Sequence, residues 1–239
     1  RVPASAYWGV ELMDEAAQQA RARLDGVLCA NIEHDVGRVR ELADHFDALV
    51  LGDVLEHFQD PWRVLKALRS FMTPDGVCVA CIPNVGHWSM VAELLQGKWR
   101  YADHGLLDRT HLRFFTLDTA VELFEKAGWT VLDALPRKLQ QDASEAALKT
   151  LLPAAVAMGM DEDKARLNLT AFQWVIRAVN GAAPRVTTVA AVGSRKIAGV
   201  TEARVDYPMR ALSTLPAAKV HWREGTLVLP EDVQEGVLV

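Results

Sequence analysis

The chain has 239 residues, of which 50% are hydrophobic and 24% are charged, which is typical of a globular protein of one domain or one domain plus part of another. Its net charge of −5 and lack of a basic stripe argue against binding nucleic acid through the phosphates. We expect no membrane span and no signal peptide, and the three cysteines lie in apolar runs, as expected for reduced thiols of a cytoplasmic protein.

Strands and helices alternate along the first half of the sequence. A helix is expected over residues 14–24, capped by Asp14, and another begins at Asp60-Pro61, with Asp60 as N-cap and a turn over residues 73–76 after it. The apolar runs around these helices are predicted strands: residues 7–11, 27–30, 46–51 and 77–82. Continuous apolar runs separated by helices indicate an α/β fold with a doubly wound, mostly parallel sheet.

The second half continues this pattern and then changes. A helix over residues 117–127 is capped by Thr116 and stopped by Gly128, and a strand over residues 129–132 follows. Residues 136–168 predict a helical excursion. Alternating apolar residues over 172–179 then predict a strand that pairs antiparallel at the sheet edge, beside the strand at residue 129, so that residues 1–180 form one sheet.

A linker-like break at residues 180–184 divides the chain into two predicted domains. Residues 1–182 form the first. Residues 183–239 are expected to be the start of a second α/β domain, because they are too few for a confident core of their own and end on an apolar run.

Polar residues stand where the predicted strands end. In open α/β sheets, ligands bind beyond the carboxyl ends of the strands. Glu11 suits two ribose hydroxyls, because one carboxylate can accept two hydrogen bonds, although it can also be a solvated surface acid. A nucleotide fold has a glycine-rich turn about 20 residues before this acid. Only ten residues precede Glu11, and we therefore expect the first strand and its glycine loop to be missing from this sequence.

Three segments together resemble a class I S-adenosylmethionine (SAM)-dependent methyltransferase: YWGVELMDEAAQQARARL, FDALVLGDVLEHFQDPWRVLKALRSFMTPDGVCVACIPN and HLRFFTLDTAVELFEKAGWTV. The resemblance is greatest to the branch of ubiquinone-type, sugar and natural-product methyltransferases and covers residues 7–180. Residues after Pro184 are similar to the start of a glycosyltransferase-like domain.

The resemblance implies SAM as cofactor and methyl transfer to a hydroxyl or amine of a small molecule or glycan. The alternative is a non-catalytic scaffold attached to a glycan-modifying domain. A nicotinamide-dependent oxidoreductase would use the same strand-end acid, but the chain lacks a Tyr-x-x-x-Lys pair. The expected partner is a small-molecule or sugar acceptor, and a homodimer is compatible with this interpretation.

The resemblance also assigns roles to residues. His57 is the expected base for an acceptor hydroxyl, because an imidazole titrates near neutral pH, with Glu56 beside it; alternatively, His57 only orients the turn. We expect no metal, although Asp53, Glu56 and His57 would share one face of a helical turn and could hold a divalent cation, as some ubiquinone-type relatives do. The expected cofactor-binding residues are Glu11, Leu12, Asn31, Ile32, Gly52, Asp53 and Val54.

A second dense polar patch, residues 103–113, follows the strand that ends at Pro83-Asn84. Such a loop is suited to covering an acceptor. Asp108, His111 and Arg113 can instead form an internal brace, which we favour for Asp108 and Arg113. The expected acceptor-binding residues are His87, Trp88, Tyr101 and His104.

Overall fold

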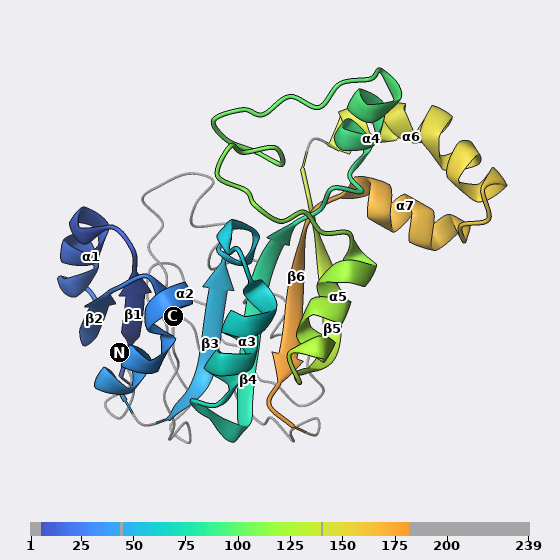
Figure 1. The fold of residues 1–239 in the computed structure, drawn as a ribbon. Helices are drawn as coiled ribbons and strands as arrows, with labels where there is room; N and C mark the ends of the chain where they lie inside the picture. Colours follow the sequence, from blue (N-terminus) through green and yellow to red (C-terminus); the bar gives the residue numbers. More distant parts are fainter. Residues whose placement is uncertain (1–5, 44, 140, 182–239) are drawn as a thin grey trace, which may run out of the picture.

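The structure is a computed structural model that describes residues 6–43, 45–139 and 141–181 (Figure 1). The predicted second domain, residues 183–239, lies outside these ranges. No helix in the described part of the chain is long and apolar enough to cross a membrane.

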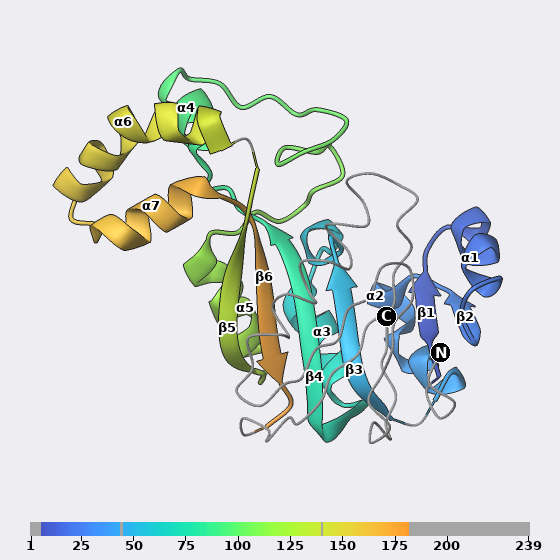
Figure 2. The same ribbon diagram turned by 180° about the vertical axis from the view of Figure 1, so that it is seen from behind.

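The strands that the structure describes form two sheets rather than one (Figures 1 and 2). β1 (Trp8–Glu11) and β2 (Gly26–Cys29) pair in parallel as a two-stranded sheet. The second sheet has the order β3-β4-β6-β5 and contains β3 (Phe46–Gly52), β4 (Met72–Pro83), β5 (Thr130–Lys138) and β6 (Ala171–Val179). The expected single sheet is therefore wrong, because no described strand hydrogen-bonds to both β1 and β3.

The direction of β6 confirms the sequence prediction, but its position does not. β6 is antiparallel to both neighbours, pairing Ile176 with Ala80 of β4 and with Ala134 of β5. It lies between these strands, so the sheet edge is β5. The helical segment after β5 is long enough to bring the chain back to a position between β4 and β5. Almost all residues of β6 are buried in this position.

Helices connect these strands. The bounds are α1 (Asp14–Arg21), α2 (Ile32–Asp35), η1 (Val36–Glu41), η2 (Leu55–His57), α3 (Pro61–Arg69), α4 (Trp88–Leu95), α5 (Leu117–Lys126), α6 (Gln141–Ala157) and α7 (Glu162–Thr170), where η denotes a 3-10 helix. The predicted caps of α3 and α5 are confirmed: Asp60 accepts a hydrogen bond from the Arg63 amide at 3.0 Å, and Thr116 forms a capping box with Thr119. At α1 the N-cap is Met13, because Asp14 already has helical geometry.

The predicted turn over residues 73–76 is part of β4. The register of β4 against β3 shifts between the pair Phe46–Met72 and the pair Ala48–Val77. The extra residues therefore form an irregularity within one long strand rather than a separate turn.

The main core lies between the four-stranded sheet and the helices α3 and α5 (Figure 1). Leu65 of α3 and Phe124 of α5 are fully buried with Trp174 and Ile176 of β6. A second apolar cluster joins α6 and α7, through Leu148, Leu151, Leu152, Ala165 and Leu169, and α4 packs against it. α4, α6 and α7 thus form a helical layer beyond the end of the sheet where β3 and β4 finish (Figures 1 and 2).

Candidate active site

A cavity of 430 Å³ lies between the two sheets and extends along β1 and β3, from their first residues, Trp8 and Phe46, to residues beyond their ends. Its walls include Trp8 and Val10 of β1 and Leu49 and Leu51 of β3. The predicted cofactor-binding residues that line it are Glu11, Leu12, Asn31, Ile32 and Val54. His57 lines the same cavity. The fold thus brings strand-end residues up to 46 positions apart in the sequence to one space.

Local hydrogen bonds orient the side chains of Glu11 and Asn31, which line the cavity. Glu11 accepts a hydrogen bond from the Met13 amide at 3.0 Å through one carboxylate oxygen. Asn31 is the N-cap of α2 and accepts from the Glu33 amide at 3.0 Å. Glu33, which the sequence did not single out, is buried and accepts from the Asp60 amide at 3.0 Å, so it ties α2 to the start of α3.

Asp53 turns away from the cavity, and neither Gly52 nor Asp53 lines it. Its backbone has a φ of 54°, a left-handed conformation that costs a non-glycine residue energy. Its carboxylate accepts a hydrogen bond from Gln173 of β6 at 2.5 Å, and Gln173 in turn accepts one from Arg137 of β5. This chain of hydrogen bonds holds the strained corner that leads from β3 into η2.

Glu56, His57 and His111 form a compact cluster beside the cavity. One ligand atom from each residue lies within 4.8 Å of those from the other two, and His111 Nε2 is 3.9 Å from Glu56 Oε1. The two imidazole rings meet edge to face with centroids 4.9 Å apart. Asp53 is not part of this cluster, so the structure brings together a different set from the Asp53, Glu56 and His57 considered from the sequence.

Glu56 is 1% exposed, and neither carboxylate oxygen has a hydrogen-bond partner among the residues that the structure describes. Burial raises the pKa of Glu56 to about 8, because the charged form loses its hydration. Burial also lowers the pKa of His111. His57 is half-buried and shared between the cluster and the cavity.

The loop between α4 and α5, residues 96–116, is attached to η2 by its backbone. The amides of Leu112 and Arg113 both donate to the Glu56 carbonyl, at 2.8 and 3.0 Å. Arg113 also donates from its side chain to the Gln59 carbonyl at 3.0 Å. Asp108 accepts from the Thr110 amide at 2.8 Å. Asp108 and Arg113, the two residues expected to form a brace, thus both make structural hydrogen bonds. These hydrogen bonds go to Thr110 and Gln59 rather than from Arg113 to Asp108.

Comparison with known proteins identifies the fold family. Residues 1–134, more than half of the chain, match the family model described as a methyltransferase domain. The chain belongs to this methyltransferase domain family. This confirms the resemblance to a class I SAM-dependent methyltransferase, a class whose cofactor is SAM.

Two curated relatives are similar to part of this methyltransferase chain. Both are named ubiquinone biosynthesis O-methyltransferase and come from strains of Cereibacter sphaeroides; they are 31% and 30% identical over 97 residues. The match covers 40% of this chain and 37% of each relative.

Solved structures of low sequence identity are also similar. One is a SAM-dependent methyltransferase from Archaeoglobus fulgidus, with 15% identity, a TM-score of 0.48 and coverage of 72% of this chain and 75% of that one. Another, from Thermotoga maritima, has 17% identity, a TM-score of 0.44 and coverage of 73% and 72%.

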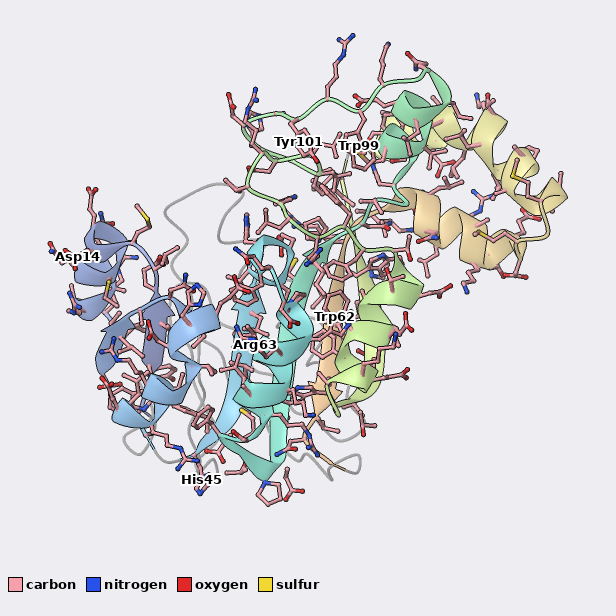
Figure 3. All side chains as sticks on the ribbon, in the orientation of Figure 1. Asp14, His45, Trp62, Arg63, Trp99 and Tyr101 are labelled. Atoms are coloured by element: carbon pink, nitrogen blue, oxygen red, sulfur yellow. The ribbon has the colours of Figure 1, made fainter. Side chains whose placement is uncertain are left out.

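The residues expected to bind the acceptor lie apart from the cavity. His87 is 2% exposed, caps α4 and has its Nδ1 2.8 Å from the Ser89 hydroxyl, and burial lowers its pKa to about 4. Trp88 donates to the Ser144 hydroxyl at 2.9 Å. Tyr101 and His104 are exposed on the α4–α5 loop, and Figure 3 shows Tyr101 with Trp99 on this loop, beyond the end of the sheet. The acceptor role of these four residues stays a prediction, and the burial of His87 suits it to a structural role.

Sequence reasoning missed His111 as a member of the candidate site. The sequence pattern suggests His111 only as part of an internal brace, although this residue lies in the polar patch that follows the strand ending at Pro83-Asn84. The sequence does place this histidine in a loop that returns to the carboxyl edge of the sheet, from which it can reach the Glu56-His57 turn. The local sequence pattern does not indicate which polar residue of the loop makes that contact.

Proposed function

We propose that this chain binds SAM in the cavity between β1 and β3 and transfers its methyl group to an acceptor beside His57. The observation that carries the proposal is that one cavity is lined by Glu11, Asn31, Val54 and His57. The acceptor is a hydroxyl or amine of a small molecule or glycan.

The cavity has the chemistry that a nucleoside needs. Glu11 has one carboxylate oxygen in a hydrogen bond to its own loop, which leaves acceptor capacity for ribose hydroxyls. Val10, Leu12 and Ile32 supply apolar surface for the base, and the amide of Asn31 offers a polar contact at the rim.

The transfer itself is an in-line displacement. The acceptor's lone pair forms a bond to the methyl carbon while the carbon–sulfur bond breaks, and its electrons stay on sulfur to give S-adenosylhomocysteine. A hydroxyl acceptor must also lose its proton, and the cluster of Glu56, His57 and His111 lies where the cavity borders η2. The name of the two curated relatives, O-methyltransferase, supports a hydroxyl as acceptor.

Calorimetric titration of the full-length chain with S-adenosylhomocysteine tests cofactor binding. We expect Glu11→Ala to weaken binding by about 1–3 kcal/mol, or roughly 5- to 150-fold in Kd, because charge-assisted hydrogen bonds are lost. Glu15→Ala is the matched control, since Glu15 is exposed on α1 and does not line the cavity. Wild-type protein that binds no S-adenosylhomocysteine would overturn the proposal, and equal affinity in Glu11→Ala would remove Glu11 from the site.

Single-turnover transfer from radiolabelled SAM to a panel of phenols, sugars and amines tests the chemistry. We expect His57→Ala to lower the rate by roughly 10²–10⁴ for a hydroxyl acceptor, the usual contribution of a well-placed group that removes a proton. The affinity for S-adenosylhomocysteine should change far less. Equal losses in rate and affinity would show that His57 is structural, and cofactor binding without turnover of any acceptor would support a scaffold role.

A further inference from the structure

We propose that Gln173 of β6 is a positioning residue for methyl transfer, because it fixes the backbone corner from which η2 and His57 begin. The role of His57 in this inference rests on the proposed function. Gln173 does not line the cavity. It acts through Asp53, whose carboxylate accepts a hydrogen bond from the Gln173 side-chain amide at 2.5 Å.

The backbone of Asp53 provides the first argument. Asp53 is the only non-glycine residue with a positive φ in the described part of the chain, at 54°. This left-handed conformation is unfavourable for a residue with a Cβ, and it persists where surrounding contacts hold it. Asp53 directly precedes Val54, which lines the cavity, and η2, which carries His57. A change in the φ of Asp53 would therefore turn η2 relative to the cavity.

The burial and orientation of Gln173 provide the second argument. Gln173 is 7% exposed, and an amide buried to this extent costs free energy unless it is hydrogen-bonded. Its side-chain oxygen accepts a hydrogen bond from Arg137 of β5. A guanidinium group only donates, so the oxygen of the amide faces Arg137 and the NH₂ group faces Asp53. Arg137 thus orients Gln173 as a donor to the Asp53 carboxylate.

The place of the contact in the sheet provides the third argument. β4 separates β6 from β3, so no ladder of backbone hydrogen bonds joins Gln173 to the end of β3. The last backbone contact at this corner is long, because the Asp53 amide is 3.3 Å from the Cys81 carbonyl oxygen. On the far side of the corner, the amides of Leu112 and Arg113 hold the Glu56 carbonyl. The Gln173 side chain therefore supplies the short hydrogen bond that holds η2 from the side of β3.

The expected consequence is a change in the rate of transfer rather than in cofactor binding. His57 Nδ1 is 3.1 Å from the Thr110 carbonyl oxygen, which only accepts, so Nδ1 carries the proton and Nε2 keeps the lone pair of a base. Displacing a reacting group by about 1 Å can cost roughly 10²-fold in rate. Glu11 and Asn31 follow the strands of the other sheet, so their contribution to nucleoside binding should not depend on Gln173.

A double-mutant cycle between Gln173 and Asp53 on the full-length chain tests the inference. Glycine adopts a positive φ readily, so Asp53→Gly makes the corner independent of the hydrogen bond. We expect Gln173→Leu to lower the single-turnover rate, with the most reactive acceptor of the panel, by roughly 10- to 100-fold in the presence of Asp53. On the Asp53→Gly background the same substitution should cost less than about threefold.

Thr170→Val is the matched control for general loss of stability. It removes a buried hydrogen bond from the Thr170 hydroxyl to the Arg166 carbonyl, three residues before Gln173. Its effect should be the same on both backgrounds within about twofold, because it does not act through Asp53. Equal rate losses from Gln173→Leu on the two backgrounds would overturn the inference.

The NMR resonance of the His57 Hε1 proton gives a readout that needs no activity, and His57→Gln assigns it. We expect this resonance to shift in Gln173→Leu, but not when Gln173→Leu is added to Asp53→Gly. An unchanged resonance in Gln173→Leu would overturn the inference. Gln173→Asn, which keeps a buried amide but is too short to reach Asp53, replaces Gln173→Leu if that variant does not fold. A chain that binds no S-adenosylhomocysteine disproves the proposed function, whereas the resonance still decides whether Gln173 positions η2.

Discussion

We expect the side chain of Asn84 to stabilise the folded protein through hydrogen bonds, so that its removal destabilises the protein. Asn84 directly follows the last residue of β4 and is fully buried. Its side-chain amide donates to the carbonyls of Asn168 and Ala171, at 2.8 and 2.7 Å, and its side-chain oxygen accepts from the Gly86 amide at 2.9 Å. These bonds join the end of β4 to α7 and the start of β6.

The magnitude follows from these three hydrogen bonds. Asn84→Ala removes all three and leaves two carbonyls and one amide of the backbone without their partner. At about 1 kcal/mol net for each hydrogen bond, and more where the remaining group stays buried, the free energy of unfolding should fall by about 2–4 kcal/mol. The cavity between β1 and β3 should keep its affinity for ligand, because Asn84 does not line it.

The assay is urea unfolding followed by tryptophan fluorescence. Asn168→Ala is a matched control from the same junction. Within the described part of the chain the Oδ1 of Asn168 has no hydrogen-bond partner, so truncation of this side chain should cost less than about 1 kcal/mol. If the free energy of unfolding falls by less than about 1 kcal/mol in Asn84→Ala, or by the same amount in both variants, the stabilising role of Asn84 is refuted.

Two further predictions concern stability. Burial lowers the pKa of His87 in the folded protein to about 4, below the ordinary value of 6.5. As the pH falls, His87 is therefore protonated in the unfolded chain before it is protonated in the folded one. The free energy of unfolding should decrease by about 1–3 kcal/mol between pH 6.5 and pH 4. Urea unfolding at pH 7 and pH 4.5 should show a smaller drop in His87→Asn, and identical pH dependence in the two proteins would contradict this. Asp60→Ala should cost about 1 kcal/mol through loss of the α3 cap, against less than 0.5 kcal/mol for exposed Asp75→Ala, and thermal unfolding that ranks the two variants the other way would exclude the cap as the cause.

The sequence by itself determined the elements whose signals are local. Asp60-Pro61 predicted the start of α3, and Thr116 and Gly128 predicted both ends of α5, because an N-cap side chain, a fixed proline φ and a left-handed glycine act within one helical turn. The alternation of residues 172–179 likewise predicted a strand, since side chains in a strand point alternately to its two faces. That Glu11 and Asn31 line one cavity was predictable, because residues at the carboxyl ends of parallel strands share one edge of the sheet.

Only the tertiary structure decided what depends on partners distant in the sequence. The place of β6 between β4 and β5 is set by the path of the preceding helices, which a strand pattern does not contain. Asp53 turns from the cavity because Gln173, 120 residues later, binds its carboxylate. His111 joins Glu56 and His57 because two loop amides bind the Glu56 carbonyl. Side-chain spacing along the sequence describes one turn or one strand, whereas these contacts arise from how separate elements pack.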